Sequence, residues 1–297
     1  MLLSQSKNLD LIFKLLIGLD LIAMLIIFIH ARIWPDFPFP VLGSRLNNPF
    51  MFLLILLVLR GWVNLEFRER QLALIARVTT EEPIRFYFFS LLLMMQVGLQ
   101  VMWFLYPWDF FWNLNAEKGY GTLFATGQLF LLGIVVLITA YEDFGPDTPW
   151  RDRFPWFFVA FVYLFIGLDD CVGIHENFIA IGGKMALESV AFHFIHEWLW
   201  FYGPVALIVA IFLARFFLKR FSYSPKVMIT MFVALALWVG VLVLEGLSKK
   251  IIDPLSYDYT RILVGIEEGF EMLGATLFMI GFSKHLKNLQ DKSRPDS

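Results

Sequence analysis

The chain has 297 residues, of which 59% are hydrophobic, 18% aromatic and 17% charged, and its formal net charge is −2. A typical soluble domain is about 45–50% apolar and about 25% charged. This composition argues against a soluble enzyme and a disordered chain, and the small net charge leaves no basic face for nucleic acid. A single cysteine, Cys171, excludes an internal disulfide and a Cys-rich metal site. We therefore expect an all-α, polytopic transmembrane helix bundle with no soluble domain.

Eight stretches of the sequence approach the ~20 apolar residues that a helix needs to cross the hydrocarbon core of a bilayer. They are residues 11–30, 50–65, 84–106, 121–141, 154–175, 197–218, 227–247 and 262–282. The second stretch is short and contains Arg60, whose long side chain could extend to a membrane interface. Eight spans are therefore predicted, with seven as the alternative, in one integral-membrane bundle over residues 1–297.

The basic residues are distributed unevenly between the two sides of these predicted spans. Sixteen Lys and Arg residues flank one side and seven flank the other. Because basic residues gather on the cytoplasmic side, both termini are predicted to be cytoplasmic. On that same side, Glu66 and Arg70 have i,i+4 spacing in segment 66–85, which predicts a solvated helix.

Acidic and histidine residues gather at the opposite, outer ends of four predicted spans. Ionisable residues inside a membrane are costly and commonly mark functional sites. The cluster contains Asp169, Asp170, His175, Glu176, His193, His196, Glu197, Glu245, Glu267, Glu268 and Glu271.

Helical spacing draws several of these side chains onto common faces. Residues 193, 196 and 197 are at i, i+3 and i+4, so they form one stripe of a helix. Glu267 and Glu271 share a face, and so would Asp169 and Glu176, across Gly173. The spacing therefore predicts that the four helices contribute to one site.

Carboxylate and imidazole ligands without thiolates suit zinc, iron or manganese. Inward-facing Glu and His from several helices also build the two-metal carboxylate sites of helix bundles. We therefore expect a divalent metal, with two ions as an alternative to one. The predicted ligands are His175, Glu176, His193, His196, Glu197, Glu267, Glu268 and Glu271. The predicted catalytic or supporting proton acceptors are Asp169, Asp170 and Glu245.

Each group of residues also has a purely structural interpretation. The histidine stripe could be an interfacial helix face that touches water. The pair Asp169 and Asp170 could be hydrogen-bonded at a helix break. Glu245 could form an ion pair with Lys249 at i+4. For His285, which stands alone, the structural interpretation is the stronger one.

Two short motifs resemble a known group of proteins. The strings Asp169-Asp170-x4-His175-Glu176 and Glu267-Glu268-x2-Glu271-x2-Gly274 resemble those of a bacterial multipass inner-membrane protein family of unassigned function. In that family an acidic pair precedes His-Glu at one helix end, and the last helix is rich in Glu. The resemblance covers roughly residues 155–282. It implies a location in the bacterial inner (plasma) membrane and supplies no reaction.

Three functions are compatible with these patterns. The first is a metal-dependent hydrolase or oxidoreductase that acts on a lipophilic substrate at the outer leaflet. The second is a proton- or cation-coupled transporter, and the third is an accessory or haem-binding membrane subunit. Carriers usually place coupling residues near the midplane, whereas here the inner half offers only scattered polar residues such as Gln96, Gln100 and Gln128. The expected partners are membrane lipids and a lipophilic substrate, not nucleic acid.

Overall fold

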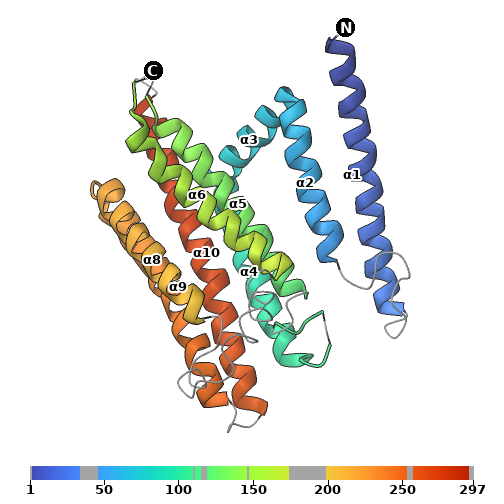
Figure 1. The fold of residues 1–297 in the computed structure, drawn as a ribbon, viewed down its shortest axis with the longest axis vertical. Coiled ribbons are helices and arrows are strands. Elements are labelled where there is room, and N and C mark those ends of the chain that lie inside the picture. The colour runs from blue at the N-terminus through green and yellow to red at the C-terminus, as the bar shows by residue number, and fades with distance from the viewer. Residues whose placement is uncertain are drawn as a thin grey trace. The chain divides into compact units, whose positions relative to one another are not determined.

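The structure is a computed structural model that describes residues 2–33, 46–109, 111–114, 119–145, 147–173, 199–252 and 257–293. Within these residues every regular element is a helix, so the all-α class is confirmed. The chain divides into two compact units, Met1–Ile75 and Ala76–Ser297, and each is described by itself. Figure 1 labels their helices.

The first unit contains α1 (Leu2–Ile33), α2 (Asn47–Val63) and most of α3 (Leu65–Thr80), with α1 packed along α2. Arg60 of α2 is paired within this unit. Its Nε donates to Asp10 Oδ1 of α1 at 2.9 Å, and its guanidinium lies 3.9 Å from the Phe67 ring centroid. The same Asp10 oxygen accepts a 2.9 Å hydrogen bond from Asn64, just before α3. The extension of Arg60 to a membrane interface stays a prediction.

The predicted solvated helix is α3, which makes an angle of 118° with α2. Arg70 and Glu66 form the expected i,i+4 ion pair at 2.5 Å on its exposed face. This part of the sequence prediction is confirmed.

The second unit contains α4 (Ile84–Leu105), α5 (Tyr120–Asp143), α6 (Trp150–Val172), α8 (Leu199–Phe221), α9 (Pro225–Ile252) and α10 (Tyr257–Ser293). Helix α10 packs against α4, α5 and α9, while α6 packs on α5 and α8 on α9 (Figure 1). The α10 side chains Met272, Phe278, Phe282 and Leu286 are fully buried. Helix α10 is therefore the central helix of this unit.

A helix lies over each of the eight predicted stretches, yet fewer of them are suited to cross a membrane. Among the described residues, five are long and apolar enough: Asn8–His30, Ile84–Leu105, Tyr120–Asp143, Trp150–Val172 and Pro225–Leu244. The bent pair α2 and α3 gives a sixth if it counts as one span. The prediction of eight spans is therefore wrong in number.

The reason lies in the two helices that fail this test, α8 and α10. Helix α8 carries Arg215, Lys219 and Arg220 in its last two turns. Helix α10 carries Glu267, Glu268 and Glu271 within its apolar stretch. Charged residues therefore keep α8 and α10 out of a count that rests on length and composition.

Candidate functional site

A cavity of about 570 Å³ lies in the second unit between α6, α8, α9 and α10. Its walls are mostly apolar and include Phe158, Phe161, Phe165, Val205, Val209 and Trp238. Three carboxylates also line it, Asp169 and Asp170 from α6 and Glu271 from α10. The volume lies within the range of small-molecule sites, which combine apolar walls with a few polar groups. We call these three residues the acidic end of the cavity.

The two aspartates reach the cavity because α6 ends directly after them. Gly173 adopts a left-handed conformation, with φ 67°, and donates its N–H to Asp169 O at 2.7 Å. Glycine is favoured at such a helix end because it has no Cβ. Thr126 of α5 donates to Asp170 Oδ2 at 3.1 Å, which ties the end of α6 to α5. Helix α6 ends at Val172, and Glu176, which was predicted to share a face with Asp169, lies outside the described residues.

Helix α9 contacts α10 closely beside Glu271. Trp238 donates its indole N–H to Glu271 O at 3.1 Å, and its ring lines the cavity. A Cβ added at Gly274 would lie 2.4 Å from Trp238 Cδ1. The glycine therefore leaves the space in which the indole ring packs, and this ring forms part of the cavity wall.

The structure brings together three of the predicted site residues, namely Asp169, Asp170 and Glu271. Glu267 and Glu268 lie on α10, partly buried, and are not among the side chains that line the cavity. Glu245 belongs to α9, but its side chain lies outside the described residues. Also outside them are His175, Glu176, His193, His196 and Glu197. Over the residues that are described, no group of three or more His, Cys, Asp or Glu side chains could hold a metal ion.

Two glutamines that the sequence analysis treated as scattered polar residues belong to one buried network. Gln96 of α4 and Gln128 of α5 each donate to Thr276 Oγ1 of α10, at 2.6 and 2.8 Å. Gln96 also donates to Met272 O at 3.0 Å. These hydrogen bonds give the amide N–H groups of both glutamines acceptors and join three helices of the bundle. No local pattern predicts it, since the bonded residues are 148 and 180 positions apart.

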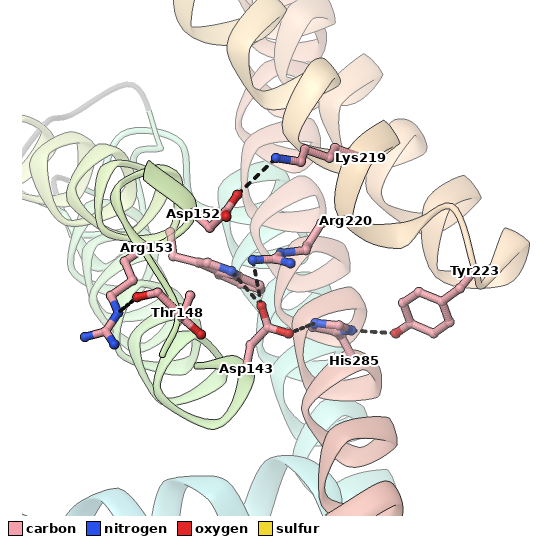
Figure 2. Close-up of polar contacts among 9 residues, drawn as sticks. Asp143, Thr148, Asp152, Arg153, Lys219, Arg220, Tyr223 and His285 are labelled. Atoms are coloured by element: carbon pink, nitrogen blue, oxygen red, sulfur yellow. Dashed lines mark hydrogen bonds and ion pairs between the residues drawn. The ribbon is translucent and has the colours of Figure 1, made fainter. Parts of the chain in front are cut away.

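A second polar cluster lies near the other ends of the same helices, and Figure 2 shows most of it. We call it the Asp143 cluster; it consists of Asp143, Trp156, Arg220, Tyr223 and His285. Arg220 pairs with Asp143 Oδ2 at 2.9 Å, and Trp156 Nε1 donates to the same oxygen at 3.0 Å. His285 Nε2 lies 4.0 Å from Asp143 Oδ1, and Tyr223 Oη lies 2.5 Å from His285 Nδ1. The cluster therefore connects α5, α6, α8 and α10.

The protonation state of His285 follows from its surroundings. Burial, together with the positive charges of Arg220 and Lys292, lowers the pKa of His285 to about 4. The ring is therefore neutral at pH 7, and it stacks on Trp156 with a centroid distance of 5.7 Å. When Nδ1 of the neutral ring accepts a hydrogen bond from the Tyr223 hydroxyl, the ring N–H is at Nε2 and faces Asp143. His285 is thus a buried packing residue, as its structural interpretation predicts.

The sequence analysis missed the other members of this cluster. Arg220 was counted only among the basic residues that indicate topology, and Asp143 was not singled out. One signal was available, namely that Asp143 is an acid directly at the end of a long apolar stretch. Along α6, Trp156 and Asp169 are 13 residues apart, which corresponds to about 20 Å at 1.5 Å per residue. The Asp143 cluster and the acidic end therefore lie at different depths of the bundle.

Comparison with known proteins adds one finding. A family model described as a domain of unknown function (DUF8692) matches residues 50–286. That range includes every residue that lines the cavity. No curated protein and no solved structure matches the chain.

Proposed function

We propose a function for this protein, which belongs to the DUF8692 family. It takes a lipophilic molecule into the cavity between α6, α8, α9 and α10, and it holds the polar group of that molecule at the acidic end. One observation carries the proposal. Apolar walls from these helices and three carboxylates, Asp169, Asp170 and Glu271, belong to the same cavity. The proposal includes a bacterial inner-membrane location with both termini in the cytoplasm.

The lining defines the chemistry of the ligand. Removing apolar surface from water contributes roughly 25 cal/mol per Å², so the walls favour a hydrocarbon or aromatic body. Ionised carboxylates accept hydrogen bonds and repel other anions. The polar group of the ligand therefore donates hydrogen bonds or carries positive charge. A phosphate or carboxylate group is disfavoured there unless a metal ion intervenes.

A metal-dependent enzyme is the second candidate. The observation that favours it is that two predicted catalytic residues, Asp169 and Asp170, line one cavity with a predicted ligand, Glu271. In this version a zinc, iron or manganese ion, or a pair of ions, is held near the acidic end. Its further ligands would come from His175, Glu176, His193, His196, Glu197, Glu267 and Glu268, with Glu245 as a proton acceptor. The ion would supply Lewis acidity or redox chemistry for hydrolysis or oxidation of a lipophilic substrate.

The proposal is tested on the full chain purified in a mild detergent. Lipophilic molecules that remain bound are extracted and measured by mass spectrometry. Ala206→Phe adds volume to the cavity wall without changing a charge, and Asp169→Asn with Glu271→Gln removes charge from the acidic end. Glu142→Gln is the control, because Glu142 is an exposed acid of α5 outside the cavity.

We expect bound lipophile in the wild type and in the control, a loss of most of it in Ala206→Phe, and less of it in the double variant. Equal amounts in all four proteins would overturn the proposal. Elemental analysis of the same samples separates the two candidates. A stoichiometric metal that is lost in the double variant supports the enzyme, and a metal-free protein with bound lipophile eliminates it.

A further inference from the structure

The contacts between α6 and α8 follow one antiparallel register. Asp152 pairs with Lys219 at 3.2 Å (Figure 2). The rings of Trp156 and Phe216 lie 4.9 Å apart. The rings of Phe158 and Phe212 follow at 4.7 Å. Along this interface the residue numbers therefore rise on α6 as they fall on α8.

Beyond the Phe158–Phe212 contact, the same register leads into the cavity. The next opposed positions are Phe161 with Val209 and Phe165 with Val205, and all four side chains line the cavity. The two helices are therefore in contact on the side of the Asp143 cluster, and the cavity lies between them on the side of the acidic end.

Some of these lining residues also belong to the outer surface of the unit. Phe161 is 59% exposed, Phe165 37% and Val205 56%. A side chain that both lines a cavity and is exposed lies at its mouth. Helix α6 is one of the helices apolar enough to span a membrane by length and composition. In a bilayer that α6 crosses, these exposed apolar side chains would face hydrocarbon and the mouth would open sideways into the lipid.

The side chains at the mouth determine which kind of molecule can enter the cavity. Its side chains are aromatic and aliphatic, so a hydrocarbon chain passes without removing water from a charged group. The lipid that surrounds the helices supplies such chains at high concentration. We propose that an acyl chain of a membrane lipid enters the cavity between α6 and α8, through the mouth formed by Phe161, Phe165 and Val205. This inference rests on the proposed function and names the ligand class and the route into that site.

Trp238 is the reporter for the test, because its indole ring lines the cavity from α9. The full chain is reconstituted in vesicles of phosphatidylcholine with brominated acyl chains, since bromine quenches the fluorescence of a tryptophan that it contacts. The fluorescence of Trp238 is obtained as the difference in tryptophan fluorescence between matched proteins with and without Trp238→Phe. This difference is measured in the wild type, in Val209→Phe, which adds volume to the cavity wall opposite Phe161, and in Ile208→Phe. Ile208 is the control because it is the adjacent α8 residue, 67% exposed and not part of the lining.

We expect the Trp238 signal to be quenched in the wild type and in Ile208→Phe, and quenched at least two-fold less in Val209→Phe. An unquenched Trp238 in the wild type, or equal quenching in Val209→Phe, would overturn the inference. If bound lipophile is recovered from detergent while Trp238 is not quenched, the route and the acyl class are wrong and the proposed function stands. If the cavity variants leave the bound lipophile unchanged, the proposed function itself fails.

A second measurement does not require Trp238 to be replaced. Vesicles that contain phosphatidylcholine with a photoactivatable group in one acyl chain are irradiated with the wild-type protein, and labelled residues are identified by mass spectrometry. Adducts on Trp238 or Val209 support the inference. Adducts confined to exposed residues outside the lining, such as Ile208, contradict it.

Discussion

Acidic side chains have different surroundings at the two ends of the second unit. At one end Asp143 is paired with Arg220, accepts a hydrogen bond from Trp156 and faces His285. At the other end Asp169, Asp170 and Glu271 line a cavity. Asp143 is carried by α5, and the acids that line the cavity are carried by α6 and α10. The groups that surround each acid therefore differ between the two ends.

The comparison has an energetic basis. A charge removed from water is tolerated when a partner of opposite sign and good hydrogen bonds replace the water. Asp143 has both kinds of partner, so its role is to hold α5, α6 and α8 together. The carboxylates of the acidic end line a cavity, and one of them, Asp170, accepts a hydrogen bond from Thr126. We therefore expect changes at the Asp143 cluster to affect stability and changes at the acidic end to affect binding.

The largest effect on stability is expected for Arg220→Met. It leaves Asp143, whose side chain is only 12% exposed, without its ion-pair partner. Breaking one partner of a buried pair typically costs about 3–5 kcal/mol, and the partial exposure of Arg220 favours the lower value. The measurement is the thermal unfolding midpoint in detergent. Lys219→Met is the control, because the Lys219–Asp152 pair is exposed and worth less than about 1 kcal/mol. Equal unfolding midpoints for the two variants would show that the Arg220–Asp143 pair contributes no more to stability than the exposed Lys219–Asp152 pair.

The next effect is a loss of stability in acid. The pKa of His285 is lowered from its ordinary 6.5 to about 4 in the folded protein. As pH falls from about 6.5 to about 4, His285 binds a proton in the unfolded chain but not in the folded chain. The free energy of unfolding therefore decreases. The total decrease is about 3 kcal/mol, at 1.36 kcal/mol for each pKa unit. It is measured as unfolding midpoints across this pH range.

His285→Gln serves as the control for this pH dependence. It keeps a polar side chain but removes the titrating group, so its midpoint should vary less between pH 6.5 and pH 4 than that of the wild type. A variant that keeps the full dependence would show that another group is responsible.

A moderate effect is expected for Gly274→Ala, beside the acidic end. The added Cβ would lie 2.4 Å from Trp238 Cδ1, so the indole ring must move. Overpacking of this kind costs about 1–3 kcal/mol. Gly18→Ala in α1 is the matched control, because a Cβ there meets nothing within 4 Å and alanine favours a helix. A Gly274→Ala protein as stable as its control would mean that the ring adjusts freely.

The smallest effect on stability is expected for Glu271→Gln. The amide has nearly the same shape as the carboxyl group and keeps one acceptor oxygen, so the unfolding midpoint should change by less than about 1 kcal/mol. The amount of bound lipophile should nevertheless decrease, because one carboxylate of the acidic end is lost. A loss of stability as large as that of Arg220→Met would show that Glu271 stabilises the helix packing. It would contradict the contrast between the Asp143 cluster and the acidic end.

Part of the candidate site could be predicted from the order of the residues alone. Asp169 and Asp170 end one apolar stretch and Glu271 begins another of opposite direction, so a common depth follows from counting. The Asp143 cluster could not be predicted in this way. Asp143 and Arg220 are the ends of separate helices, and their contact depends on how those helices pack. The metal ligands predicted from His175 to Glu197 stay a prediction, since those residues lie outside the described part of the chain.

The sequence by itself determined the local features of this protein: a wholly helical chain, apolar stretches of membrane length and the solvated α3 with its Glu66–Arg70 pair. These features follow from composition and from spacing within single helices, which tertiary contacts do not alter. Only the tertiary structure showed that α10 buries its apolar residues among the helices around it. It also placed Asp143 beside Arg220 and brought Asp169, Asp170 and Glu271 to the lining of one cavity. Helix packing brings together residues distant in sequence, and spacing along the chain does not specify that packing.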